Sequence, residues 1–277
     1  MKTIELNKKN IPVPSNWDEL KQSQILKISI ARMQVASPKN QADLSTLKML
    51  YFSVITDIPQ WKQKNFTSEQ WVDLLKLTEF LFDTPKFTAN PFMRVRISMT
   101  MVLHGPIGYL ETSCFAEFMT ADNAFIDFHN NRNPDAAYLL FATLWRKQRS
   151  DLKQFKQDPD QWNEDVRVPF NQSQCEAIAA KLKTKKRVAP YAMMAVIYYE
   201  SFRSQAVTGN PLLKPLFNKA AGFGKKSSGL GWMETLIAQS GTKFGDFNST
   251  SRTNWLLVLI DVAIKLNQKQ ELEKQNS

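Results

Sequence analysis

Residues 113–149, SCFAEFMTADNAFIDFHNNRNPDAAYLLFATLWRKQR, decide the fold of this chain. They predict two helices joined by a tight turn at 129–134, because Asn133 is a good helix cap and Pro134 suits a first helical position. The first helix carries apolar side chains three and four residues apart, and the second is apolar nearly all round as far as Trp145. We therefore expect this pair of helices to lie buried at the centre of a helical fold.

One carboxylate interrupts the apolar stripe of the first helix. Asp122 lies in the middle of that stripe, three residues before Phe125. An unpaired carboxylate there is costly, so we expect either a cation beside it or a position at the edge of the stripe, in water. We predict a structural ion pair between Asp122 and Arg146, with Arg94 or Arg96 as the alternative cation.

The composition narrows the class of protein. The 277 residues suffice for one large core or two modest ones, and nine glycines are few for this length, which favours helices over enclosed sheets. No apolar run approaches the ~20 residues of a membrane span, and the N-terminus has no signal-peptide pattern. The two cysteines form no metal or disulfide pattern. A protein of a reducing, intracellular compartment is expected, with no membrane partner.

Helical periodicity and proline positions divide the chain into parts. We predict an all-α bundle of about nine to eleven helices with at most a minor β hairpin. Its parts are an N-terminal helical unit with an extended arm (1–87), the central helical hairpin (88–152), a linker or packed loop (153–170) and a C-terminal helical unit (171–277). For 85–110 a helix or a strand pair is possible, but irregular structure that ends in a short extended piece is favoured.

A formal net charge of +10 favours an acidic partner, whether nucleic acid, an acidic protein or an anionic surface. The densest basic cluster in the sequence is a candidate patch for binding a partner. The glycine-rich stretch at 222–231, together with Trp232, is a candidate loop for binding a partner. The patch consists of Lys181, Lys183, Lys185, Lys186 and Arg187, and the loop contains Lys225, Lys226 and Trp232. Trp61 and Trp232 are the tryptophans that we expect to be exposed. No helix-turn-helix, zinc-finger or RNA-recognition motif supports base readout.

No catalytic signature stands out. The two histidines, His104 and His129, belong to no metal or triad pattern, and Cys114 lies about 20 Å along the first helix from His129. The Gly-Lys-Lys sequence of the glycine-rich stretch lacks P-loop spacing. The remaining enzymatic hypothesis is an acid/base pair of Asp122 and Asp261, which requires an open polar pocket around one of them. We therefore predict no cofactor and no metal.

Several softer motifs follow one another in a recognisable order. They are IPVPSNWDELKQSQILKISIA (11–31), FAEFMTADNAFIDF (115–128), AYLLFATLWR (137–146), YAMMAVIYYESFRS (191–204), a Pro-Leu-Phe turn, a Gly/Lys/Ser loop, GWMETLIAQSGTKFGDF (231–247) and TNWLLVL (253–259). In this order the chain resembles helical tail-assembly accessory proteins, chaperone-like, of tailed bacteriophages and prophages of Bacteroidetes-type bacteria.

The resemblance implies a non-enzymatic protein that binds structural partners in tail assembly. Its partner would be a phage structural protein such as the tape-measure protein, and the chain would either chaperone it or form part of the virion. The implied location is the host cytoplasm, with virion association as the alternative. The expected mechanism is an apolar or aromatic groove that receives amphipathic helices. Two alternatives stay open: a basic nucleic-acid-associated protein that uses 181–187, and an enzyme of unknown type that uses buried carboxylates.

Overall fold

A computed structural model describes residues 1–6, 9–34, 41–64, 66–158, 162–221 and 231–275. Within these ranges the chain forms thirteen α-helices and two antiparallel sheets of two strands each. The prediction of a predominantly helical protein is confirmed. The helices outnumber the predicted nine to eleven, because short helices of four residues such as Gln60–Gln63 and Leu152–Phe155 add to the count, and there are two β hairpins where at most one was expected.

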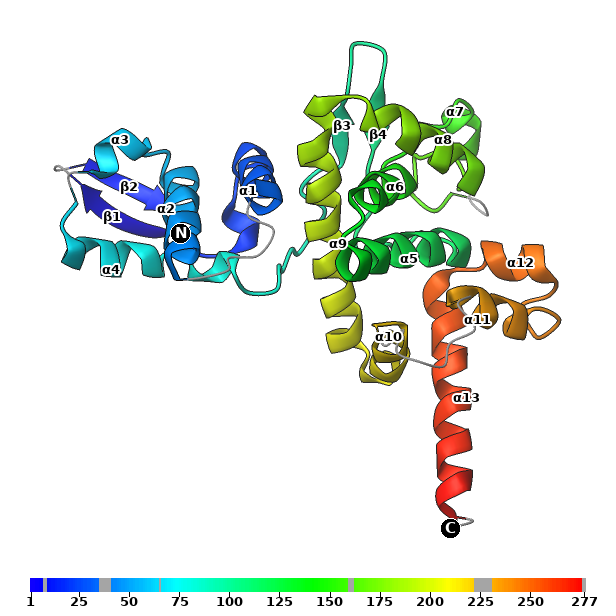
Figure 1. Ribbon diagram of the computed structural model, residues 1–277. Helices are drawn as coiled ribbons and strands as arrows, with labels where there is room; N and C mark the ends of the chain where they lie inside the picture. The colour runs from blue at the N-terminus through cyan, green and yellow to red at the C-terminus, as the bar shows by residue number, and fades with distance from the viewer. Residues whose placement is uncertain (7–8, 35–40, 65, 159–161, 222–230, 276–277) are drawn as a thin grey trace.

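The N-terminal arm is a β hairpin. Its strands are β1 (Lys2–Leu6) and β2 (Lys9–Val13), in which Thr3 is paired with Pro12. Pro12 fits in this strand because an edge strand tolerates a residue without an N–H donor. Four helices follow the hairpin and are drawn on the left of Figure 1: α1 (Gln22–Gln34), α2 (Gln41–Thr56), α3 (Gln60–Gln63) and α4 (Ser68–Lys76).

The segment 85–110 is irregular over most of its length, as favoured, but it contains the strand pair that was the alternative. Strands β3 (Arg94–Arg96) and β4 (Val102–His104) are antiparallel, with Val95 opposite Leu103. Both of these side chains are buried, whereas Arg94 and Arg96 are exposed. This alternation between buried and exposed positions is what a strand with one face on the core requires.

The central helical hairpin forms as predicted. Helix α5 (Phe115–Asn131) is followed by α6 (Pro134–Leu144), and the side chain of Asn133 accepts a hydrogen bond from the backbone of Asp135 at the start of α6. Helix α6 ends at Leu144, and Trp145 is its C-terminal cap. Arg146 instead exchanges two backbone hydrogen bonds with His104, at 2.7 and 3.0 Å, and so extends the β3–β4 sheet edge.

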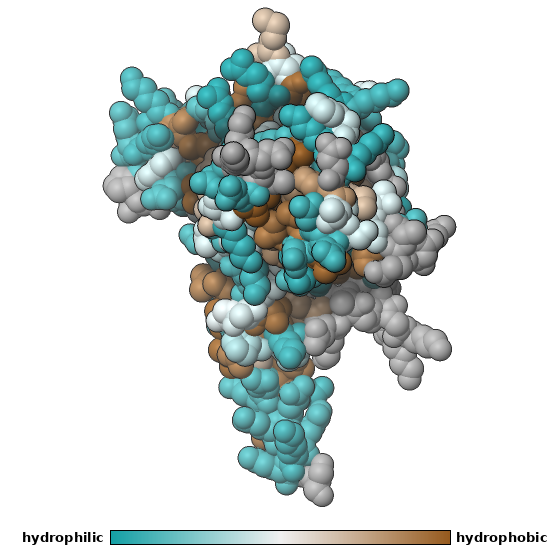
Figure 2. Space-filling view, turned by 90° about the vertical axis from the view of Figure 1, so that its left-hand side faces the viewer, coloured by the Kyte–Doolittle hydropathy of each residue, from teal (hydrophilic) through white to brown (hydrophobic). Residues whose placement is uncertain are grey.

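The second half of the chain surrounds the central hairpin. Its helices are α7 (Leu152–Phe155), α8 (Gln172–Lys183), α9 (Ala189–Gly209), α10 (Lys214–Ala221), α11 (Trp232–Gln239), α12 (Phe247–Arg252) and α13 (Trp255–Gln275). Helix α9 packs against α6 and also against α1, which joins the N-terminal part to the body. The end of α13 projects from the body (Figure 1), and its surface is hydrophilic in Figure 2. None of the described helices has the length and hydropathy to cross a membrane.

The centre of the core is an aromatic cluster around Phe118 of α5. Its ring stacks on Trp255 at 5.1 Å between centroids, and it also meets Phe115, Phe202, Phe217 and Trp232. These rings come from α5, α9, α10, α11 and α13. Because pairs of aromatic rings add stabilisation beyond the burial of area, Phe118 is the main apolar anchor of the C-terminal helices.

Substitution Phe118→Ala is expected to lower the free energy of unfolding by about 3–5 kcal/mol, because it removes a fully buried ring and leaves a cavity. Phe128→Ala on the same helix removes a half-buried ring and serves as the control, with a smaller loss. Denaturant unfolding followed by circular dichroism measures both. Equal losses for the two variants would contradict the central position of Phe118.

Candidate functional site: a partner-binding groove

Asp122 is the first predicted site residue to be placed by the structure. It has no exposed surface, and its carboxylate accepts hydrogen bonds from Arg203 Nε at 2.7 Å, Trp232 Nε1 at 2.7 Å and Tyr199 Oη at 3.2 Å. The expectation of a neighbouring cation is confirmed, and the alternative position in water is wrong. The predicted partner Arg146 is also wrong, since the cation comes from α9.

The same contacts correct the prediction for Trp232. It is only 5% exposed, because its indole N–H is directed at the buried Asp122 carboxylate and its ring packs on Phe118. Burial first, and then the charge of Asp122, raise the pKa of Tyr199 well above its ordinary value, so its hydroxyl remains a donor. Trp61, the other tryptophan expected to be exposed, is 67% exposed, which confirms that prediction.

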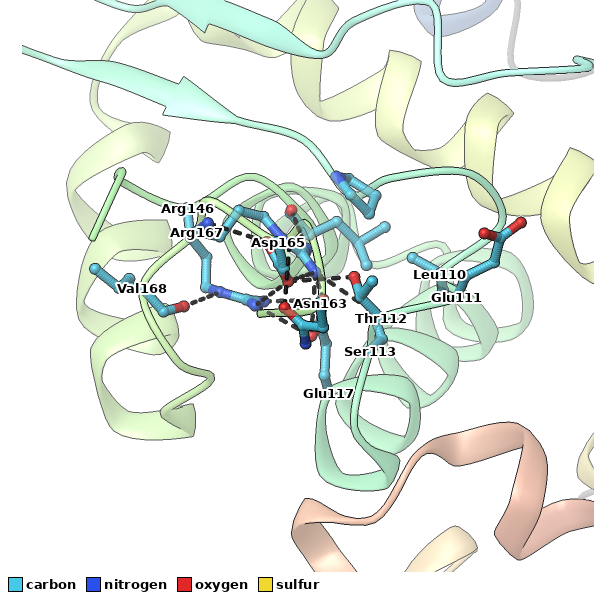
Figure 3. Close-up of polar contacts among 12 residues, drawn as sticks. Leu110, Glu111, Thr112, Ser113, Glu117, Arg146, Asn163, Asp165, Arg167 and Val168 are labelled. Atoms are coloured by element: carbon cyan, nitrogen blue, oxygen red, sulfur yellow. Dashed lines mark hydrogen bonds and ion pairs between the residues drawn. The ribbon is translucent and has the colours of Figure 1, made fainter. Parts of the chain in front are cut away.

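Arg146 belongs to a second buried cluster, which is shown in Figure 3. Its guanidinium contacts the Glu117 carboxylate at 2.9 Å and donates to the backbone carbonyls of Thr143 and Val168. In an antiparallel helical hairpin, the end of the second helix lies level with the start of the first. Arg146 therefore meets Glu117 on the first turn of α5 rather than Asp122, which lies more than a turn further along.

Arg167 completes this cluster and was not predicted. It makes two hydrogen bonds with Asp165, at 2.8 and 2.7 Å, and one with Glu117 at 2.7 Å, and it is 2% exposed. Burial by itself lowers the pKa of Arg167, but the charge of Glu117 and the contacts with Asp165 outweigh it, so the pKa lies above its ordinary value. The segment 153–170, predicted as a linker or packed loop, thus packs against the core through Arg167.

The buried acids offer little to acid/base chemistry. Asp261, the second acid of the enzymatic hypothesis, lies between Lys243 Nζ at 2.6 Å and Lys265 Nζ at 2.7 Å. Burial raises the pKa of Asp261, but the two lysine contacts outweigh it and hold the pKa below its usual value. Asp122 is buried and ion-paired, and Asp261 is held between two lysines. Both arrangements argue against a catalytic role for these acids, because a general acid or base needs a proton that can move to a substrate.

The nucleophile and metal hypotheses receive no more support. Burial raises the pKa of the Cys114 thiol to about 11, which disfavours the reactive thiolate. Burial, together with the nearby arginines, lowers the pKa of His129. Among the residues whose positions are described, no three His, Cys, Asp or Glu side chains gather closely enough to hold a metal ion.

A groove of about 750 Å³ lies between the N-terminal helices and the turn of the central hairpin. One wall comes from α1, α2 and the 3-10 turn η2 (Glu79–Leu81), and the other comes from the α5–α6 turn and α9. Most of its lining is apolar or aromatic. These side chains are Met33, Leu47, Tyr51, Leu81, Phe82, Phe128, Pro134, Ala137, Tyr138, Ala189, Ala192 and Met193.

The groove also has charged and polar side chains in its lining. Arg32 is paired with Glu200 at 3.4 Å, and its guanidinium lies over the ring of Trp17. Arg132, His129 and Asp83 also line the groove, together with the hydroxyl-bearing Tyr51 and Tyr138. The lining is thus mainly apolar and aromatic, with a few charged side chains, which is a composition that ligand- and partner-binding clefts often have.

The predicted basic patch is on the surface. All five cations lie at the end of α8 and in the 3-10 turn η3 (Lys186–Val188), where Lys183 pairs with Asp135 of α6 and Lys185 is half-buried. The two lysines of the predicted partner loop, Lys225 and Lys226, lie outside the described residues. The basic patch thus lies on the surface, whereas Trp232 of the predicted partner loop belongs to the core.

Comparison of the chain with models of known protein families, with curated protein sequences and with solved structures finds no match.

Substitution Glu117→Gln is expected to lower the free energy of unfolding by about 3–5 kcal/mol, because it leaves two buried guanidinium groups with one carboxylate. Asp151→Asn, which disrupts the Asp151–Arg149 pair at the surface, is the matched control and is expected to cost less than about 1 kcal/mol. Urea unfolding measures both. A cost for Glu117→Gln no greater than that of the control would contradict the account of the cluster.

The cluster also predicts a sensitivity to acid. Burial raises the pKa of Asp165, but Arg167 and Arg146 outweigh it, so the folded-state pKa lies below the unfolded value. The ionised carboxylate therefore stabilises the fold above about pH 4, and this contribution is lost as the pH falls through the folded-state pKa. Urea unfolding at a series of pH values should show a weaker acid dependence for Asp165→Asn than for the control Asp73→Asn. Identical acid dependence would contradict the prediction.

Proposed function

We propose that this chain is a non-enzymatic protein-binding module that holds an amphipathic helix of a structural partner in the groove between α1, α2 and the α5–α6 turn. The observation that carries the proposal is the groove itself, which is open and lined mainly by apolar and aromatic side chains. Following the resemblance in sequence, the partner is a phage structural protein such as the tape-measure protein, bound in the host cytoplasm during tail assembly.

The groove suits a helix because its apolar side chains lie on both walls. Met33 of α1 and Phe82 after η2 are partly exposed on one side, and Phe128 and Met193 lie on the other. An amphipathic helix presents apolar residues at positions i, i+3 or i+4, and i+7, which fill such a groove as a row of anchors. Methionine adapts its shape to different partners, so Met33 and Met193 favour a partner with several similar helical segments.

The charged groups at the groove supply orientation more than affinity. Arg32 and Glu200 neutralise each other, and the pKa of His129 is lowered by burial and by nearby arginines, so its charge is small near neutral pH. The net charge of +10 increases the rate of encounter with an acidic partner. The binding energy in this proposal therefore comes from apolar burial, and it is expected to persist at raised salt.

A photoreactive residue at position 82 tests the proposal in the cells that produce the protein. We expect it to crosslink to a long helical structural protein, identified by mass spectrometry, whereas the same residue at position 237 on α11 should not. Ile237 is exposed and is not among the residues that line the groove, so it is the matched control. Recovery of no structural protein, or equal crosslinking at both positions, would contradict the proposal.

The double substitution Met33→Glu, Phe82→Glu is expected to abolish capture of that partner, because it places two charges on the apolar wall. The double substitution Val72→Glu, Ile237→Glu changes the net charge equally at exposed sites outside the groove and should leave capture unchanged. Affinity purification at low and high salt, with equal melting temperatures as the check on folding, makes the comparison. Loss of capture in both double variants would point to charge rather than to the groove.

A further inference from the structure

The β3–β4 hairpin projects from the end of the body opposite the tip of α13 (Figure 1). The sequence around it contains no carboxylate: between Asp83 and Glu111 the charged side chains are Lys86, Arg94 and Arg96. A segment of this length without an acid is unusual in a chain that has 26 acidic residues. The carboxylate of Asp18 meets it at Thr88, six residues before Arg94, and the hairpin itself carries only positive charge.

The two arginines lie on the outer face of the hairpin. Arg94 and Arg96 alternate with the buried Val95, so their side chains point to the same, exposed side. Among the described residues, no carboxylate lies within 4.0 Å of either guanidinium, whereas Arg146, Arg167 and Arg203 are all paired. The hairpin arginines are therefore available to an anion from outside the chain.

The base of the hairpin is held firmly. The backbone of Gly105 donates to Met93 at 2.9 Å, Trp145 Nε1 donates to the carbonyl of Phe92 at 2.7 Å, and His104 is paired with Arg146. At Gly105 a Cβ atom would lie 2.6 Å from the Trp145 indole nitrogen, so the close approach requires glycine. Arg94 and Arg96 therefore lie on a β hairpin whose base is fixed by hydrogen bonds to the body.

The basic patch of η3 lies at the same end of the molecule. Phe92, two residues before Arg94, contacts Tyr191, which is four residues after Arg187, with ring centroids 6.4 Å apart. Lys186 and Arg187 are exposed, and the sequence has no acid from residue 177 to residue 199. The fold therefore brings together two acid-free basic segments that are about ninety residues apart in sequence.

The tip of the hairpin carries one exposed apolar side chain, Met99, between Ser98 and Thr100. Met99 is 95% exposed, and Met93 at the base is also exposed. The B-DNA major groove admits a two-stranded β ribbon, and proteins that bind DNA through a ribbon or wedge often place arginine on phosphates and an apolar side chain among the bases.

We propose that the β3–β4 hairpin and η3 form a binding surface for duplex DNA. Arg94, Arg96, Lys186 and Arg187 contact phosphates, and the hairpin enters a groove with Met99 at its tip. The contacts are independent of base sequence, because they are made to phosphates, which carry no sequence information directly. The surface is distinct from the partner-binding groove, and it does not depend on the proposed function.

DNA is favoured over an anionic membrane by the chemistry of the surface. Arginine binds phosphate with two parallel hydrogen bonds, which suits the regular phosphates of a duplex. Stable membrane binding needs a broad apolar face, whereas the exposed apolar side chains here are the two methionines Met93 and Met99. The narrow, projecting shape of the hairpin in Figure 1 likewise fits a groove better than a flat surface.

The test is fluorescence anisotropy of a labelled DNA duplex of mixed sequence with the full chain, at salt concentrations from about 50 to 200 mM. We expect binding that weakens steeply with salt. Arg94→Ala, Arg96→Ala should weaken binding about tenfold or more and reduce the slope of log Kd against log salt by about 2. The control Lys269→Ala, Lys274→Ala removes the same charge from the exposed end of α13 and should change binding far less.

Substitution Met99→Ser tests whether the tip of the hairpin contacts the DNA. It should weaken binding several-fold without changing the slope against salt, because it removes apolar contact and no charge. Unchanged affinity would overturn the placement of the tip in a DNA groove. Absence of binding at low salt, an equal loss in the charge-matched control, or preferential binding to vesicles of anionic phospholipid would overturn the whole proposal. Because the groove variant Met33→Glu, Phe82→Glu should bind DNA normally, failure of this proposal is distinguishable from failure of the proposed function.

Discussion

Two carboxylates that water cannot reach, Glu117 and Asp122, lie five residues apart on α5, and the rest of the structure is arranged to neutralise them. Glu117 requires Arg146 and Arg167, which fixes the chain after α6 and the segment that leads to α8. Asp122 requires Arg203 and Trp232, which fixes α9 and α11. A buried ion pair adds little net stability compared with an apolar pair, but removal of one partner is severe. These contacts therefore specify which segments pack around α5.

This arrangement of charge separates the interior from the surfaces that can act on other molecules. Glu117 and Asp122 are paired with arginines, and Asp122 also accepts hydrogen bonds from Tyr199 and Trp232. The features left open are apolar on one side, in the groove beside the α5–α6 turn, and cationic at the hairpin end. We propose both as surfaces for recognition, and the groove shares side chains such as Leu47, Tyr51 and Leu81 with the core. The same turn that closes the central hairpin supplies a wall of the groove.

The parts of the fold that follow from local chemistry were predictable. Asn133 and Pro134 mark the turn of the central hairpin, and the Thr67–Gln70 capping box marks the start of α4, because both signals act within a single turn of chain. The need for a cation beside Asp122 was also predictable, since it follows from burial alone. The identity of that cation, Arg203, was not predictable. It depends on how α9 crosses α5, and no local sequence pattern specifies that crossing. For the same reason Trp232, next to a glycine-rich stretch, was expected in solvent and lies in the core.

The candidate sites show the same division. The basic patch at 181–187 was visible in the sequence, but its proximity to Arg94 and Arg96 appears only when Phe92 meets Tyr191. The hairpin itself was hidden by the short length of its strands, three residues each, for which periodicity carries little information. Arg167 was overlooked because a lone arginine between two valines is as typical of an exposed strand as of a buried ion pair.

The central claim is that the neutralisation of the α5 carboxylates joins separate segments into one cooperative unit. Native-state hydrogen exchange resolved by residue tests it most directly. The account predicts that the backbone amides of α5, α6 and α9 exchange only through global unfolding, and that the amides of Arg167 and Val168, in a segment without helix, exchange at the same slow rate. Fast exchange at Arg167 and Val168, independent of α5, would contradict the claim that the buried charges hold the structure together.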